Sequence, residues 1–278
     1  MGKRKKTASR PARILAIGAH PDDCEITCGG CMALWARAGH VVHYVSATNG
    51  GTGHHAIGGI ELVRRRMAEI QAAAASLGVT CEALDVTDGE LEPSLANRRT
   101  FIRLIRAFRP DLILTHRPND YHPDHRYCSL LVQDASYVIT VPDNLPTVEA
   151  LRAAPVICYF ADGFAKPLPF SPDVVVDVDG VVERKLEAIC RHVSQVFEWL
   201  PYNARIEDQV PKTARGKKEF VRGRWLARDR RWAEKFRPQL VAKYGAAKGA
   251  KVTHCEAFEV CEYGAKLTDE KRAWLFKM

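Results

Sequence analysis

The feature of this sequence that most constrains its fold is the alternation of short apolar runs with amphipathic stretches over the first 180 residues. Several of the apolar runs are too continuous to leave one strand face in water. Strands that alternate with helices predict a mainly parallel sheet with helices on both faces, an α/β fold. We expect strands at 14–19, 41–47, 82–86, 111–115, 155–160 and 174–178, and helices at 62–77, 95–108, 181–199 and 216–236.

The composition is that of a folded protein without a membrane span. Of the 278 residues 46% are hydrophobic, yet no run approaches the roughly 18 consecutive apolar residues that a span requires. The charged stretch from Met1 to Arg10 has no apolar region behind it, so we expect a cytoplasmic protein. We read residues 1–11 as a basic flexible tail and 12–278 as a single domain with a C-terminal helical extension from about residue 200. Homo-oligomers are compatible with this reading.

The nine cysteines do not suggest a disulfide framework. Their number is odd, and they are scattered from Cys24 to Cys261 in a chain long enough to bury a core without cross-links. We expect most of the thiols to be reduced and buried. Cys28 and Cys31 form a CxxC pair near Cys24, for which a redox or zinc-knuckle role competes with simple packing at a helix start.

The positive charge is concentrated in one segment. Between Lys212 and Arg237 eleven basic residues face three acidic ones, which accounts for the whole net charge of +8. Trp225 and Trp232 lie within this segment, a combination that also occurs on nucleic-acid-binding faces. Because the large apolar residues recur near helical spacing, we instead expect buried tryptophans and a solvated arginine face, and we do not expect nucleic acid as a partner.

Polar residues gather directly after four of the predicted strands. In parallel sheets the carboxyl ends of the strands meet at one edge, where ligands bind. No GxGxxG motif and no serine in a nucleophile elbow is present, so we expect a site rich in imidazole and carboxylate. The four clusters are His20-Pro21-Asp22-Asp23, the loop 49–55, Asp88-Gly89, and His116 with residues 119–125.

Two of these clusters have the spacing of metal ligands. His20 and Asp23 are three residues apart, and so are His122 and His125. Two imidazoles, one carboxylate and an open position are typical of a catalytic zinc site, where the pKa of the bound water falls to about 7. Asp22 could then take the proton from that water, and the spare histidine could hold charge that develops on a substrate oxygen. Taken singly, each pair could also be a hydrogen-bonded turn.

The same residues resemble a known family. Residues 19–23 followed by Gly29-Gly30, together with residues 119–126, are similar to the two signature motifs of the PIG-L/LmbE family of zinc-dependent N-deacetylases. The loop 48–53 and the helix start at 66–69 are similar too, so the likeness covers roughly residues 13–200. It implies a Rossmann-like α/β fold and removal of an acetyl group from an N-acetylglucosamine unit in a small-molecule conjugate such as a glycolipid, a glycoside or a thiol precursor.

Carried over by position, the resemblance implies that His20, Asp23 and His125 hold Zn²⁺, that Asp22 is the general base and that His122 stabilises the oxyanion. Fe²⁺ or Co²⁺ would also suit these donors. In one departure, Cys24 stands where the family often has an acidic residue, and Glu25 follows one step later. The alternative function is a metal-dependent hydrolase of another amide.

Four further residues are candidates for substrate binding. Arg66 could contact a sugar or phosphate oxygen, although a solvated helix face is the simpler interpretation. Asp88 and Asn119 could bind sugar hydroxyls or only form turns. His54, beside His55 in a glycine-rich loop, could touch substrate or metal, or belong to a mobile lid.

The group attached to the amino sugar is not specified by the strand-end loops. The C-terminal extension is the segment in which enzymes of one fold differ most readily. If its arginines and lysines fold over the site, they would favour an anionic aglycone, phosphate included. Otherwise they form a solvated face remote from the chemistry.

Overall fold

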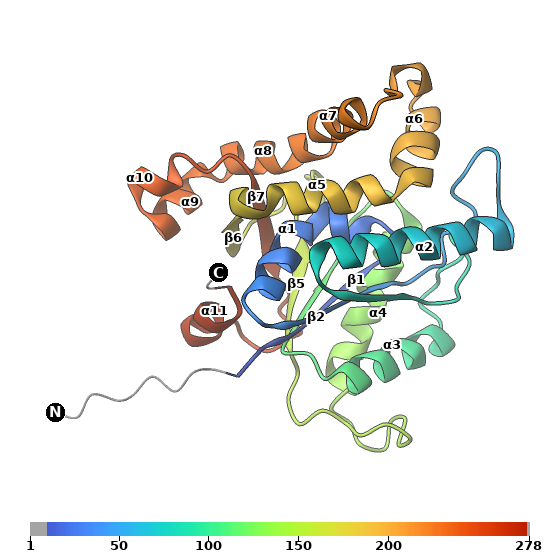
Figure 1. The fold of residues 1–278 in the computed structure, drawn as a ribbon. Coiled ribbons are helices and arrows are strands. Elements are labelled where there is room, and N and C mark those ends of the chain that lie inside the picture. The colour runs from blue at the N-terminus through green and yellow to red at the C-terminus, as the bar shows by residue number, and fades with distance from the viewer. Residues whose placement is uncertain (1–9, 277–278) are drawn as a thin grey trace.

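The computed structural model describes residues 10–276, in which seven strands form one sheet in the order β3-β2-β1-β4-β5-β7-β6 (Figure 1). All pairings from β3 to β5 are parallel, and β7 pairs antiparallel with both β5 and β6. The expected α/β fold with a mainly parallel sheet is therefore correct. The strands are β1 (Arg13–Gly18), β2 (Val41–Ser46), β3 (Thr80–Ala83), β4 (Leu112–Thr115), β5 (Val156–Phe160), β6 (Val174–Asp177) and β7 (Cys255–Val260).

Helices pack on both faces of the sheet. The α-helices are α1 (Asp23–Arg37), α2 (Gly59–Leu77), α3 (Leu95–Phe108), α4 (Pro123–Val138), α5 (Val182–Arg191), α6 (Leu200–Asn203), α7 (Ala214–Arg224), α8 (Leu226–Lys235), α9 (Arg237–Tyr244), α10 (Ala246–Gly249) and α11 (Asp269–Phe276). Short 3₁₀ turns η1 (Asp179–Val181) and η3 (Glu207–Gln209) and a π-helical turn η2 (Ser194–Trp199) complete the described elements.

Alternating residues of the central strands feed two hydrophobic cores. In β1, Ile14 and Ala16 pack with α1 and α2 on one face, whereas Leu15 and Ile17 pack with α3 and α4 on the other. All four side chains are fully buried, as a parallel strand covered on both faces requires. Helices α1, α2 and α5 cover the first face and α3 and α4 the second (Figure 1).

Local signals explain several helix boundaries. The Ser94 side chain accepts a hydrogen bond from the Asn97 N–H at the start of α3, and Arg109 ends that helix in the left-handed conformation. Gly78, with φ of 77°, ends α2 in the same way. At the start of α4 the His122 side chain caps the helix and Pro123 occupies the first turn, so the loop expected at 119–125 is in part a helix N-terminus.

Three predicted elements differ from the structure. The strand expected at 82–86 lies at 80–83. The helix expected at 181–199 ends at Arg191, because the Glu69 carboxylate takes the Ser194 N–H (2.9 Å) that a continuous helix would have used. The helix expected at 216–236 is interrupted at Trp225, two residues after the helix-weakening Gly223, and becomes α7 and α8.

The C-terminal extension is not purely helical, contrary to the expectation. Its residues 255–260 form β7, which lies inside the sheet between β5 and β6. Within the extension Trp225 packs with Phe220 and Val221, and Trp232 packs with Phe236. The tryptophans thus contribute to cores, as expected. The division of residues 12–278 as a single domain stays a prediction.

The remaining chain-level expectations have mixed outcomes. The predicted tail at 1–11 lies outside the described residues except for Arg10, which pairs with Asp111, and Pro11. Across residues 10–276, no helix is long and apolar enough to cross a membrane. All nine cysteines carry free thiols, and seven of them are buried, as expected.

Candidate active site

The turns after β1 and β4 bring the predicted metal ligands together at the carboxyl edge of the sheet. His20 Nδ1 lies 3.1 Å from His125 Nε2 and 3.5 Å from Asp23 Oδ2. His125 Nε2 lies 3.5 Å from Asp23 Oδ1. Asp23 begins α1 and His125 lies in the first turn of α4, so two helix starts position the three donors.

The spacing of His20 and His125 matches that of two ligands of a tetrahedral metal, and Asp23 faces each of them with a different carboxylate oxygen. Donors at 2.0–2.1 Å from a zinc ion in tetrahedral geometry are about 3.3 Å from one another. Other donors lie close by: His122 can join His20 and His125, His116 can join Asp23 and His125, and Asp88 and Asp124 can join His20. The chemistry of the site therefore suits a divalent cation, and the set His20, Asp23 and His125 remains the predicted one.

Carboxylates lie behind both imidazoles. His20 Nε2 is 3.1 Å from Asp88 Oδ1 and 3.1 Å from Asp124 Oδ2, and His125 Nδ1 is 3.1 Å from Asp120 Oδ2. A carboxylate on one ring nitrogen fixes the ring and leaves the other nitrogen free to bind metal. Asp120 and Asp124 lie next to the histidines in the 119–125 motif, and neither is among the predicted site residues.

The carboxylates around the predicted metal ligands favour a positive charge between them. Burial alone would lower the pKa of His20, but the carboxylates of Asp124, Asp23 and Asp88 outweigh it and raise the pKa well above its usual value. Burial alone would raise the pKa of Asp23, but His125 and His116 hold it well below its usual value. The carboxylates therefore stabilise a positive charge between them, which a bound cation would provide.

His116 directly follows the fourth predicted strand and lies at the site, although it is not among the predicted ligands or catalytic residues. Its ring stacks on His125 with 4.0 Å between centroids, and its Nε2 lies 3.1 Å from Asp23 Oδ2. Burial, together with the neighbouring His125, lowers the pKa of His116 to about 4. The ring is therefore neutral, and it packs against two of the predicted ligands.

Asp22 is buried beside the donors and carries its own cationic partner. Arg66 Nη2 lies 3.4 Å from Asp22 Oδ1 and also donates to the Pro21 carbonyl at 3.1 Å. Burial raises the pKa of Asp22, and the Arg66 charge only partly opposes this. A carboxylate with a raised pKa accepts a proton more readily, as a general base should.

His122 presents a neutral donor at the same site. Its Nδ1 accepts the Asp124 N–H at 3.2 Å, so the ring proton is on Nε2. Burial and the charges of His20 and His125 lower its pKa, which keeps the ring neutral. The ring centroid is 4.5 Å from that of His20 in an edge-to-face arrangement, which places His122 beside the predicted ligands.

The four predicted substrate residues make other contacts. Arg66 is only 2% exposed and faces Asp22. Asp88 lies behind His20, and Asn119 donates to the Lys166 carbonyl. His54 is 3.0 Å from Glu198, which also binds Arg65.

The glycine-rich loop that contains His54 is anchored rather than free. The Gln195 side chain donates to the Gly53 carbonyl at 2.9 Å, and the His55 ring stacks on Tyr202 with 4.0 Å between centroids. These contacts fasten the loop to η2 and α6. They do not favour the alternative of a mobile lid.

Glu25, the acidic residue that follows Cys24 in the first motif, is held inside the protein by hydrogen bonds. Glu25 is fully buried and bonds Tyr44 Oη (2.5 Å) and His192 Nε2 (3.0 Å). Burial raises the pKa of Cys24 and of Cys31 well above the usual value, so both thiols stay protonated. This favours packing over a redox or zinc-knuckle role for the cysteines.

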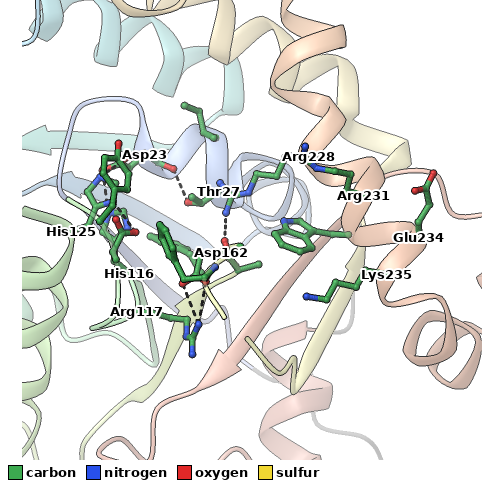
Figure 2. Close-up of a pocket in the computed structure, with 18 residues that line it drawn as sticks. Asp23, Thr27, His116, Arg117, His125, Asp162, Arg228, Arg231, Glu234 and Lys235 are labelled. Carbon is green, nitrogen blue, oxygen red and sulfur yellow. Dashed lines mark hydrogen bonds and ion pairs between the residues drawn. The ribbon is translucent and has the colours of Figure 1, made fainter. Parts of the chain in front are cut away.

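A cavity of about 800 Å³ opens beside the donors (Figure 2). Asp23, His116 and His125 form one wall, and the segment after β5 with Asp162 forms another. The facing wall comes from α8, which contributes Arg228, Arg231, Trp232, Glu234 and Lys235. Part of the basic extension thus lies over the site.

An Asp120→Asn variant tests the carboxylate behind His125. Asn keeps the size but loses the charge that orients and polarises the ring, so we expect metal affinity to fall about tenfold to hundredfold. Competition with a fluorescent chelator measures this. Asp134→Asn on the exposed side of α4 is the control, and equal affinities for both variants would remove Asp120 from the site.

Comparisons with known proteins identify the family to which the chain is similar. The family model described as PIG-L, GlcNAc-PI de-N-acetylase, matches residues 15–136. A diacetylchitobiose deacetylase of Thermococcus kodakarensis is 33% identical over 201 residues, which are 68% of this chain and 74% of that protein. A 4-oxalmesaconate hydratase of Pseudomonas putida is 28% identical over 199 residues, 68% of this chain and 76% of that protein.

A solved structure shares the fold. The N,N'-diacetylchitobiose deacetylase of Pyrococcus horikoshii superposes with a TM-score of 0.70 at 24% identity, covering 91% of this chain and 85% of that one. Both signature motifs lie within the matched residues 15–136, and they supply the three predicted ligands. The chain belongs to the PIG-L family, as its motifs predicted.

Proposed function

We propose that this protein is a metal-dependent N-deacetylase that removes the acetyl group from an N-acetylated amino sugar of the N-acetylglucosamine type. The observation that carries the proposal is the juxtaposition of His20, Asp23 and His125, with donor atoms 3.1–3.5 Å apart, beside the buried Asp22. Deacetylases among the relatives support the reaction class.

Zn²⁺ is the expected ion, and Fe²⁺ or Co²⁺ would suit the same donors. When bound, such an ion activates water for attack on the acetyl carbonyl and stabilises negative charge on its oxygen. Asp22 accepts the proton of the attacking water and returns it to the leaving amine. The Nε2–H of His122 donates to the carbonyl oxygen as negative charge develops there.

The outer contacts keep these groups in place during the reaction. Arg66 holds Asp22 in orientation at 3.4 Å, and burial still outweighs its charge, so the pKa of Asp22 stays raised. Asp88 and Asp124 orient His20, and Asp120 orients His125. The partner is thus a small-molecule amino-sugar conjugate bound in the cavity. A cytoplasmic location and homo-oligomers stay predictions.

The reaction class is tested with purified protein loaded with Zn²⁺. N,N'-diacetylchitobiose and methyl N-acetylglucosaminide are offered, and acetate and free amine are measured together. We expect equal amounts of the two products, and none from the matching glucoside without an acetamido group. Since one relative is a hydratase, 4-oxalmesaconate is offered in parallel. Hydration of that compound without acetate release from any acetamido substrate would reject the deacetylase proposal.

A further inference from the structure

One face of α8 presents a row of cations to the cavity. Arg228, Arg231 and Lys235 are spaced by three and four residues, so they lie on the same side of the helix. Figure 2 shows this helix across the cavity from Asp23, His116 and His125, with the Lys235 side chain extending toward the centre of the view. The row of cations thus lines the same cavity as Asp23 and His125 but lies on its opposite wall.

These cations lack carboxylate partners. Among residues 10–276 no ion pair involves Arg231 or Lys235, and the one hydrogen bond of Arg228 goes to the neutral Ala161 carbonyl. On α7, by contrast, Arg222 pairs with Glu183 and Lys218 with Glu187.

The carboxylates of the same cavity do not balance the row. Asp162 is paired with Arg117 at 3.1 Å, and Asp120 with His125. Glu234, the only acidic residue that α8 contributes to the lining, lies at the outer edge of the view in Figure 2. Burial lowers the pKa of Arg228, and the nearby carboxylates, Asp229 first among them, only partly oppose this. The α8 wall therefore has a net positive charge.

A buried ion cluster fixes the position of this wall. Lys185 Nζ on α5 lies 2.6 Å from Asp229 Oδ2 on α8 and 2.7 Å from Glu256 Oε1 on β7, and all three residues are buried. Glu256 also accepts the N–H groups of Gly30 and Cys31 at 2.8 and 2.7 Å. Removing any of these charges would leave others buried and unpaired, so the cluster holds α8 against the core.

The cavity also offers an uncharged polar group beside the cations. Trp232 lines it between Arg231 and Lys235, and its indole nitrogen is buried without a hydrogen-bond partner among the described residues. The volume of about 800 Å³ lies in the upper part of the range for small-molecule sites, so it can hold a group beyond one amino sugar.

We propose that the α8 wall binds an anionic group, a carboxylate or a phosphate, on the part of the substrate attached to the amino sugar, through Arg228, Arg231 and Lys235. This inference rests on the proposed deacetylase function and adds a substrate class to it. Guanidinium and ammonium groups at helical spacing can each donate to such an anion. The acetamido end would then lie at the opposite wall, toward His125.

The test compares three glycosides of N-acetylglucosamine whose aglycones differ only in a terminal hydroxyl, carboxylate or phosphate. For the wild-type protein we expect kcat/KM to be higher for the charged compounds. The double variant Arg231→Ala/Lys235→Ala should reduce the ratio of charged to neutral kcat/KM about tenfold or more, since hydrogen bonds to charged groups are worth that much. Arg224→Ala, an exposed arginine at the end of α7, is the matched control and should keep the ratio.

The outcomes separate the two proposals. If the neutral glycoside is deacetylated but the charged ones are no better, or if the double variant keeps the ratio, the anion site is rejected and the deacetylase stands. If no glycoside releases acetate, the deacetylase function fails, and the anion site is then judged by binding alone, where equal affinities for the charged and neutral glycosides would reject it. Calorimetric binding of the three glycosides then shows whether any preference for charge remains without turnover. A preference for phosphate over carboxylate identifies the group.

Discussion

An Asp22→Asn variant is expected to lose about a hundredfold to ten-thousandfold in kcat while its metal content stays at the wild-type level, because that is the usual contribution of a general base. Asn keeps the size of the side chain and its oxygen toward Arg66 but cannot accept the proton of the attacking water. Asp22 differs from its neighbour Asp23 in this respect, since burial raises the pKa of Asp22 whereas His125 and His116 overcome burial to lower that of Asp23. Steady-state acetate release and metal analysis of the same preparation measure both quantities.

The control for this variant is Asp85→Asn, in which the replaced carboxylate hydrogen-bonds the Asn49 amide at 3.3 Å outside the donor cluster. It should keep most of the wild-type kcat. Joint loss of metal and activity in Asp22→Asn would make Asp22 a ligand. A wild-type rate with full metal would mean that another group accepts the proton.

The parts of the fold that could be predicted are those whose signals are local. The predicted strands that became β1, β2, β4 and β5 agree with the structure to within a residue at each end, because strands buried largely on both faces are mostly apolar in sequence. Helix α3 was placed correctly because its apolar residues fall on one side and a serine caps it. These segments carry their own evidence for structure and burial.

Strand β7 could not be placed in the sheet from its own residues. Its sequence contains two glutamates, and Glu256 is stabilised inside the protein by Lys185, 71 positions earlier, and by the N–H groups of Gly30 and Cys31. The break after Arg191 also depends on a residue distant in sequence, since the Glu69 carboxylate on α2 accepts the Ser194 N–H. Partners that are distant in sequence decide both features, and a local pattern contains no record of them.

The contrast between local patterns and distant partners also applies to the site residues. His20 and Asp23 are three positions apart in one turn, so their proximity follows from local geometry, and only the approach of His125 required the sheet topology. Arg66 and His54 were considered for substrate because they follow the second strand on the ligand edge. Their partners in the structure, Asp22 and Glu198, lie on other segments of the chain.

Loss of His125 should remove the metal as well as the activity. His125 brings a donor nitrogen from α4 to the two donors at the start of α1, so His125→Ala leaves only two of the three predicted ligands, His20 and Asp23. We expect about one equivalent of divalent metal per wild-type chain and far less in the variant, since loss of a direct ligand should exceed the tenfold to hundredfold affinity cost of losing an outer partner. Because the ion contributes several kcal/mol of transition-state stabilisation, kcat/KM should fall about a thousandfold or more.

The control for the metal experiment is another histidine change at a distance from the donors. His43 on β2 contacts Thr80 at 2.8 Å and Glu82 at 3.3 Å, so His43→Ala removes an imidazole without touching the cluster. It should bind the same amount of metal as the wild type. Circular dichroism of both variants shows whether they remain folded, and chelation of the wild type followed by Zn²⁺ addition should remove and restore activity. Full metal occupancy in folded His125→Ala would mean that the neighbouring His116 and His122 suffice with Asp23 and His20, and the predicted ligand set would be wrong.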